Sequence, residues 1–159
     1  SIRFDLTDSN MLTLPWTLQP GDAAISETPM LLEIELISAH YLPKPSKKMP
    51  SLNPYVEITV RRVEEDDQTV RSTWIEKNGF DPRWRETFSF EVRNLELSLV
   101  SFIVKDAVSN KALIGQTALP LSCIQPGHRT VPLRYANWVP NDSFLFCKFL
   151  WRDKAADPV

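Results

Sequence analysis

Hydrophobic and polar residues alternate along most of the chain in short runs, a period typical of half-buried β-strands. The clearest run is 55–62, where Val56, Ile58 and Val60 form one apolar face. Eight such segments can be counted, at 31–38, 55–62, 69–77, 86–92, 97–106, 112–119, 130–134 and 143–151. No stretch keeps a helical period for three turns, although 121–127 suits a short helical turn. The pattern predicts an all-β fold, an eight-stranded antiparallel β-sandwich.

The first thirty residues do not share this alternation. They read as an extended lead-in punctuated by proline, with the apolar residues Leu14, Trp16 and Leu18 in need of a surface. We expect this extension to pack along the sandwich or to be the remnant of a preceding domain. The predicted division is therefore an N-terminal extension at 1–30, one domain at 31–152 and a tail at 153–159. We expect the chain to be a fragment of a larger protein.

Length, composition and charge exclude several classes of function. A length of 159 residues suits a single domain, and a formal net charge of -2 gives no bulk attraction to nucleic acid. No apolar run is long enough to span a bilayer, and no signal peptide is recognisable. Two cysteines, Cys123 and Cys147, do not make a disulfide framework. We therefore expect a cytoplasmic protein, with peripheral membrane attachment as an alternative.

Nothing in the sequence indicates catalysis. The two histidines, His40 and His128, fall at opposite ends of the predicted sandwich. Four scattered glycines make no phosphate-binding loop, and Cys and His lack metal-ligand spacing. We expect no enzyme activity. The aromatic residues are interpreted as core, namely Trp74, Trp84, Phe88, Phe90, Phe102, Phe144, Phe146 and Phe149.

Antiparallel strands would gather alternate loops at the two ends of the sandwich. One end is predicted to collect 43–54, 78–85, 106–111 and 135–142, and the other 63–68, 93–96 and 120–129. Lys44, Lys47 and Lys48 give the first end a formal charge of +3, since charges in its other loops cancel. The acidic run at 64–67 leaves the second end at -3 once Arg129 is added. The two alternatives are a functional separation of charge and ordinary solvated loops.

Several short motifs resemble a known family. They are LP at 42–43, NPYVE at 53–57, NGFDPRW at 78–84, IGQ at 114–116, LPL at 119–121, PGHR at 126–129 and VPL at 131–133. Together they resemble a C2 domain, most closely that of phosphoinositide-specific phospholipase C enzymes, over about residues 31–150. The resemblance implies a sandwich of the circular topology found in those enzymes. It also implies that the loops at 43–54, 78–85 and 106–111 form the calcium and membrane site.

The family's calcium ligands are only partly present. The first-loop aspartate is replaced by Asn53, while Asp81 matches the second-loop ligand. In the third loop Asp106 survives, Val108 stands at the next ligand position, and Lys111 lies near the last.

Calcium prefers six to eight oxygen ligands and binds more weakly as carboxylates are removed. We therefore expect no metal and no cofactor. Asp106 is expected to cap its loop by accepting backbone N–H groups, or to pair with Arg83 or Arg85.

The predicted partner is an anionic phospholipid membrane surface, contacted weakly, or another protein or domain. The candidate contact residues are Lys44, Lys47, Lys48, Arg83, Arg85 and Lys111. Met49, Leu52 and Trp138 are candidates for shallow insertion, with packing against their own domain as the alternative. Two further functions stay open, a protein-interaction module of a scaffold, cytoskeletal or trafficking protein and a calcium-dependent phospholipid sensor.

Overall fold

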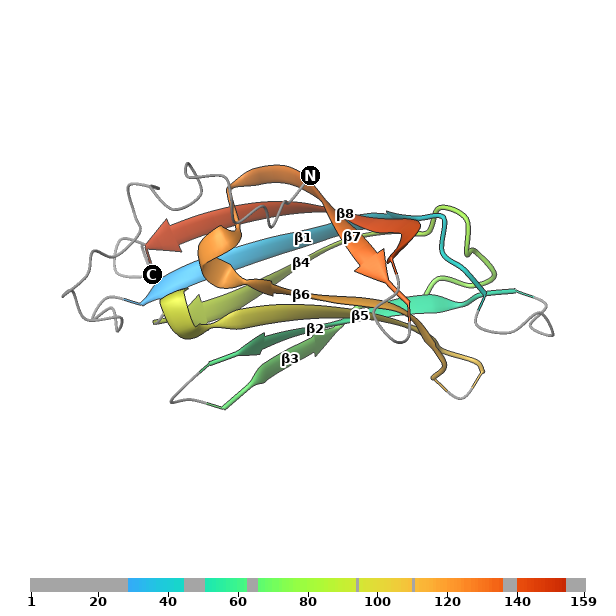
Figure 1. Cartoon of the computed structure of the whole chain (residues 1–159), viewed down its shortest axis with the longest axis horizontal. Coiled ribbons are helices and arrows are strands. Elements are labelled where there is room, and N and C mark those ends of the chain that lie inside the picture. The colour runs from blue at the N-terminus through green and yellow to red at the C-terminus, as the bar shows by residue number, and fades with distance from the viewer. Residues whose placement is uncertain are drawn as a thin grey trace.

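In the part of the chain that the structure describes, eight strands form where the sequence alternates, and two short 3₁₀ helices lie in the connections between them (Figure 1). The computed structural model describes residues 29–44, 51–62, 66–93, 95–109, 111–135 and 140–153. The strands are β1 (Met30–His40), β2 (Pro54–Arg61), β3 (Gln68–Arg71), β4 (Arg83–Val92), β5 (Leu99–Asp106), β6 (Leu113–Pro120), β7 (Gly127–Arg134) and β8 (Pro140–Asp153). The helices are η1 (Leu95–Leu97) and η2 (Leu121–Cys123), the second of which lies within the predicted helical turn.

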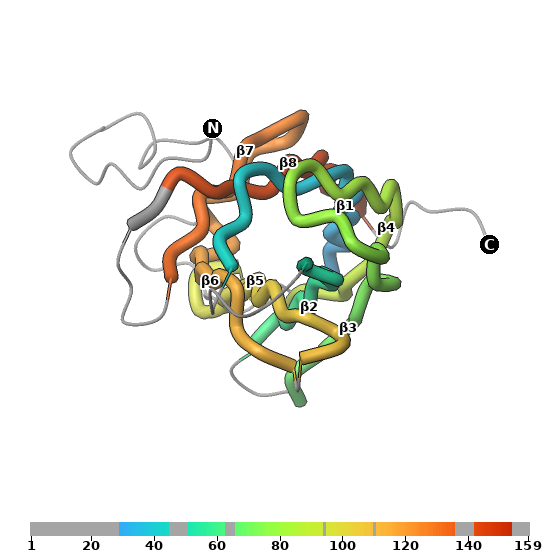
Figure 2. Tube along the Cα trace, turned by 90° about the vertical axis from the view of Figure 1, so that its right-hand side faces the viewer, coloured from blue at the N-terminus to red at the C-terminus, as the bar shows by residue number. Residues whose placement is uncertain are grey.

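The strands follow the order β3-β2-β5-β6-β7-β8-β1-β4, and every neighbouring pair is antiparallel. Seen from one end, β7, β8, β1 and β4 form one layer, and β6, β5, β2 and β3 form the other (Figure 2). Gln116 of β6 and Arg134 of β7 pair where the chain passes between the layers. The predicted eight-stranded antiparallel sandwich is confirmed.

The core lies between the layers and is built from the inward positions of each alternation. In β2 these are Val56, Ile58 and Val60, all fully buried, as the sequence pattern predicted. Phe102 of β5 meets Phe149 of β8 edge-to-face across the layers, with ring centroids 6.4 Å apart. Each fully buried side chain of this size stabilises the fold by about 1.5–3 kcal/mol.

Side chains of β4 bind the segment that follows β3. The indole Nε1 of Trp84 donates to the carbonyl oxygen of Thr73 at 2.7 Å. The carboxylate of Glu86 accepts from the backbone nitrogen of Thr73 at 3.0 Å and from its hydroxyl at 2.9 Å. These bonds satisfy groups that an unpaired sheet edge would leave exposed.

The third strand is shorter than predicted. Regular pairing ends at Arg71. Beyond it the hydroxyl of Ser72 accepts the Val56 N–H at 2.9 Å, and Ser72 and Ile75 donate their backbone N–H groups to Val56 and Pro54, which leaves one extra residue on this side. The alternation then shifts by one residue, so that Ile75 packs against the core while Trp74 is 51% exposed. The prediction that Trp74 belongs to the core was wrong.

Two further aromatic predictions need correction. Phe144 and Phe146 of β8 alternate with the buried Leu145 and Cys147, so they lie on the outer face and are only half-buried. Phe144 stacks on His40 with ring centroids 4.9 Å apart, and Phe146 stacks on His128 at 5.6 Å. Trp84, Phe90, Phe102 and Phe149 are buried as predicted, and Phe88 packs partly buried against the core.

The antiparallel pairing sends alternate connections to opposite ends of the sandwich, as predicted. We call the end that carries the β1–β2, β3–β4, β5–β6 and β7–β8 connections the loop end; it faces the viewer in Figure 2. At the other end Met30 of β1 pairs with both Val92 of β4 and Asp153 of β8. The chain therefore enters β1 and leaves β8 at the end opposite the loops.

Candidate functional site

The first two connections of the loop end are tied together by their backbones. Ala39 donates to the carbonyl oxygen of Pro82 at 3.0 Å, and Tyr41 donates to that of Phe80 at 3.2 Å. Tyr41 adopts a left-handed backbone with φ of 58°, a conformation that turns the chain out of β1. The β1–β2 and β3–β4 connections thus leave the sandwich side by side.

Asp106, the last residue of β5, has no exposed surface and caps the third connection. One carboxylate oxygen accepts from the backbone nitrogen of Asn53 at 2.6 Å. The other accepts from Val108 at 3.2 Å and from Ser109 at 2.6 Å. Burial by itself raises the pKa of Asp106, but the hydrogen bonds from these N–H groups outweigh it and hold the pKa below its usual value. The predicted capping role is confirmed.

Asn53, in the first connection, is hydrogen-bonded to both the second and the third connection. Its backbone nitrogen donates to Asp106, and its backbone carbonyl accepts from Ala107 at 2.9 Å. Its side-chain oxygen accepts from the backbone nitrogen of Lys77 at 3.0 Å. The residue is buried, so these oxygens face protein groups.

The two remaining ligand positions are less enclosed. Asp81 is half-buried, and its backbone nitrogen donates to the side-chain oxygen of Asn78 at 3.0 Å, which also accepts from Phe80. Val108 is exposed and offers an apolar side chain. Among the described residues, no three His, Cys, Asp or Glu side chains gather as a metal ion would require.

The structure places four of the six predicted basic contact residues. Lys44, Arg83, Arg85 and Lys111 are exposed at the loop end. Lys47 and Lys48 lie outside the described residues, as do Met49 and Trp138. Leu52 is 2% exposed, so the prediction of shallow insertion by this residue was wrong, and it packs against its own domain instead.

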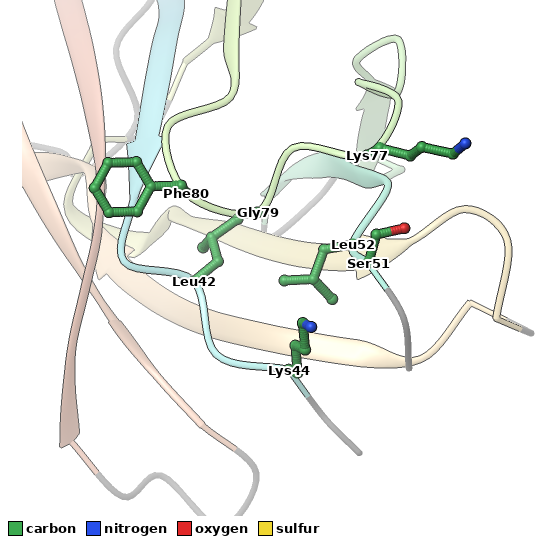
Figure 3. A pocket seen from close by; sticks show the side chains of 7 residues that line it. All are labelled: Leu42, Lys44, Ser51, Leu52, Lys77, Gly79 and Phe80. Atoms are coloured by element: carbon green, nitrogen blue, oxygen red, sulfur yellow. The ribbon is translucent and has the colours of Figure 1, made fainter. Parts of the chain in front are cut away.

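A pocket of about 350 Å³ lies between the first two connections (Figure 3). Its lining residues are Leu42, Lys44, Ser51, Leu52, Lys77, Gly79 and Phe80. Sequence reasoning missed the pocket and did not select Lys77 or Phe80 as contact residues. The NGF motif gave a signal, because glycine directly after asparagine marks a turn and suits a close approach of the backbone to another group.

Gly79 makes that close approach. A Cβ atom at this position would lie 2.6 Å from Cδ1 of Leu52 and 2.9 Å from its Cβ, too near for any side chain. The glycine therefore lets the second connection rest directly on Leu52. Beside it, Phe80 is 70% exposed and meets Tyr41, 60% exposed, edge-to-face with ring centroids 5.9 Å apart. The loop end thus carries an exposed aromatic pair.

Comparison with known proteins agrees with this geometry. The profile of the C2 domain matches residues 30–135. The rat (Rattus norvegicus) "Inactive phospholipase C-like protein 1" is 36% identical over 111 residues, covering 67% of this chain and 10% of that protein. The pig (Sus scrofa) "1-phosphatidylinositol 4,5-bisphosphate phosphodiesterase zeta-1" is 37% identical over 118 residues, covering 72% of this chain and 18% of that protein.

A solved structure shows the same fold. The crystal structure of L. pealei PLC21 superposes with a TM-score of 0.66 at 28% identity, over 82% of this chain and 16% of that one. The chain thus spans less than a fifth of these three relatives. Among the described residues, no helix has the length and apolar character needed to cross a membrane.

Proposed function

The chain belongs to the C2 domain family, and we propose that it is a non-catalytic, calcium-independent docking module. Its loop end attaches a larger, phospholipase C-like protein to anionic membrane surfaces. One observation carries the proposal: the oxygens at two calcium-ligand positions, Asn53 and Asp106, are taken up by backbone N–H groups of the loops themselves. A metal ion would have to displace bonds that already hold the loops together.

Charge supports attachment without a metal. Lys44, Lys77 and Lys111 are exposed at the loop end, and Arg83 and Arg85 are exposed on β4 beside it. They outnumber the acids of this end, which are the exposed Glu76 and Asp142, the half-buried Asp81 and the buried Asp106. Each basic residue close to an anionic leaflet contributes about 1 kcal/mol of attraction, which salt weakens. Asp106 does not oppose this attraction strongly, because its charge is buried and compensated by three donors.

The test is co-sedimentation with vesicles that contain phosphatidylserine, in calcium or in chelator and at two salt concentrations. We expect equal pelleting in calcium and chelator, and less pelleting at high salt. The K47E/K48E double variant should bind at least about 30-fold more weakly, since removing two contributions of about 1 kcal/mol already gives that factor.

The matched control reverses two charges at the opposite end. The R61E/R129E variant changes the net charge by the same amount. Arg61 ends β2 and Arg129 lies near the start of β7, so both are at the end opposite the loop end. It should pellet like the unchanged chain. Calcium-dependent pelleting, or equal losses in both double variants, would overturn the proposal.

A second function is favoured by the opposite end of the sandwich. Leu97 of η1 and Leu99 of β5 are exposed there, at the same end of the sandwich where the chain enters β1. Adjacent exposed leucines suit contact with a neighbouring domain of a longer protein. An L97S/L99S variant should then lower the melting temperature of the longer protein and leave that of the isolated chain unchanged. An equal effect on both would show that the leucines serve only the domain itself.

A further inference from the structure

We propose that the open edge of β4 pairs with the same edge of a second copy of this chain. In the part of the chain that the structure describes, β4 is the last strand of the sheet and is paired with β1 alone. An edge strand presents a row of N–H and C=O groups that can pair with another strand. This contact lies at the side of the sandwich, so it does not depend on the proposed membrane attachment of the loop end.

The outward-facing residues of β4 direct their backbone groups to this open edge. In a strand, residues whose side chains share a face direct their N–H and C=O groups to the same neighbour. The inward-facing Ala39 of β1 donates to the carbonyl oxygen of Pro82 at 3.0 Å, so the inward-facing residues of β1 are bonded on the side of β4. Their partners in β4, such as Phe88, also face the core. Thr87 and Ser89 alternate with Phe88, so their N–H and C=O groups point away from β1.

Side chains bridge from β4 to the other layer on both sides of a short stretch of this edge. On one side the carboxylate of Glu86 is bonded to the segment that follows β3, at 2.9 Å and 3.0 Å. On the other side Arg62 donates to the carbonyl oxygen of Glu91 at 3.3 Å, which suits a carbonyl that points away from β1. Thr87 and Ser89 lie between these bridges and are exposed. We call these two residues the edge window.

One register of self-pairing fits the edge window. A two-fold axis at Phe88 places Thr87 of each copy opposite Ser89 of the other, so the backbone groups of both windows are paired. An axis at Thr87 would place Ser89 opposite Arg85, outside the window. An axis at Ser89 would place Thr87 opposite Glu91, whose carbonyl already accepts from the other layer.

Charge selects the same register. With the axis at Phe88, Arg85 lies opposite Glu91 of the second copy, and this relation occurs twice. Opposite charges that face each other across two strands are stabilising, and like charges are destabilising. With the axis at Ser89, Arg85 would instead face Arg93. Arg85 has a left-handed backbone with φ of 53° beside the bulge in the β1 register, so it marks the end of the paired stretch.

The pairing has a consequence for the loop ends. It would join the β7, β8, β1 and β4 layers of two copies into one continuous sheet (Figure 2). Because the two β4 strands are antiparallel, the loop ends of the two copies would point in opposite directions. One flat surface could then contact only one loop end of each dimer.

The first experiment measures the mass of the 159-residue chain by analytical ultracentrifugation. A contact as small as one strand edge is expected to be weak, so the concentration should extend from about 10 µM to about 1 mM. The mass should rise with concentration from 18.2 kDa toward twice that value. A mass that stays at 18.2 kDa throughout would overturn the proposal.

The decisive variant is T87P, and T69P of the other edge strand is its matched control. Both threonines are exposed or half-buried residues of edge strands. In β3 the N–H of Ser72 is bonded to Val56, so that of Thr69 points away from β2. Proline at either position thus removes an N–H that does not serve the ladder. T87P should weaken self-association at least about tenfold, and T69P should stay within about twofold of the unchanged chain. Equal losses, or a loss in T69P alone, would overturn the assignment to β4.

Charge reversal tests the register and does not depend on how T87P folds. R85E and E91R should each weaken self-association, because each places like charges opposite one another twice. The R85E/E91R variant should return to within about twofold of the unchanged chain. Within one copy the two residues lie about 20 Å apart along the strand, so the recovery can come only from pairing between copies. Two weakened single variants without recovery in the double variant would overturn the proposed pairing.

Discussion

Removing the carboxylate of Asp106 should destabilise the domain by a measurable amount. Asn53 donates its backbone N–H to this carboxylate in a buried setting, and leaving that donor unpaired costs about 1–3 kcal/mol. The N–H groups of Val108 and Ser109 lie in the connection itself, where water can replace the lost acceptor. Each then loses only the net value of its bond, about 0.5–1.5 kcal/mol. D106A is therefore expected to lower the free energy of unfolding by about 2–6 kcal/mol.

Urea denaturation measures this change. For a domain of this size, with a slope of about 2 kcal/mol per M, the expected loss corresponds to a midpoint lowered by about 1–3 M, with the slope unchanged. The free energy of unfolding of D106N should lie between those of D106A and the unchanged chain. Its amide oxygen can still accept a hydrogen bond, while its amide nitrogen faces a donor. D81N is the control, since Asp81 is bonded through its backbone N–H, which the substitution leaves in place. The free energy of unfolding of D81N should stay within about 0.5 kcal/mol of that of the unchanged chain.

The pH dependence gives a second test of the same carboxylate. The pKa of Asp106 is lowered on folding, so its contribution is fully present above the ordinary aspartate value of about 3.9. The contribution is lost as the pH falls through the lower, folded value. Between about pH 5 and pH 3 the unchanged chain should therefore lose more stability than D106N does. A D106A variant as stable as the unchanged chain, or parallel pH curves, would refute the capping argument.

Three other predictions follow from single contacts. G79A should lower stability by about 1–3 kcal/mol, because its Cβ would overlap Leu52; an unchanged melting temperature would show that the connection can move away. W84F should cost about 0.5–1.5 kcal/mol in urea denaturation through the lost bond to Thr73, and no change would mean that water replaces it. In the folded chain a thiol reagent should modify Cys123 first, because complete burial raises the pKa of Cys147; two equally fast thiols would contradict this.

The sequence predicted those parts of the fold that depend on local alternation. All eight strands appear, and alternation alone fixed which side of β2 faces the core. Their antiparallel order was enough to collect the loops at the correct ends. The alternation failed at Trp74, because one extra residue lies between the backbone bonds of Ser72 to Val56 and of Ile75 to Pro54 and shifts the phase by one. An irregularity of that kind leaves no periodic trace.

The candidate site could be predicted only in part for a similar reason. The capping role of Asp106 follows from an acid at the mouth of a short loop, and the structure confirms it. The pocket depends instead on Gly79 reaching Leu52 across two connections, which is a tertiary contact. Without it Leu52 looked like a free apolar residue in a loop. The same contact explains why Leu52 is buried.

The pairing of Met30 with Asp153 has a mechanical consequence. Tension applied through the segments before β1 and after β8 acts on two adjacent strand ends, so it would peel the strands apart with the backbone hydrogen bonds breaking one after another. Tension between the loop end and the segment before β1 runs along β1 instead, over its eleven residues and about 35 Å. The bonds of β1 to β8 and β4 then share the load. The domain should therefore resist force best when its loops are the anchored point.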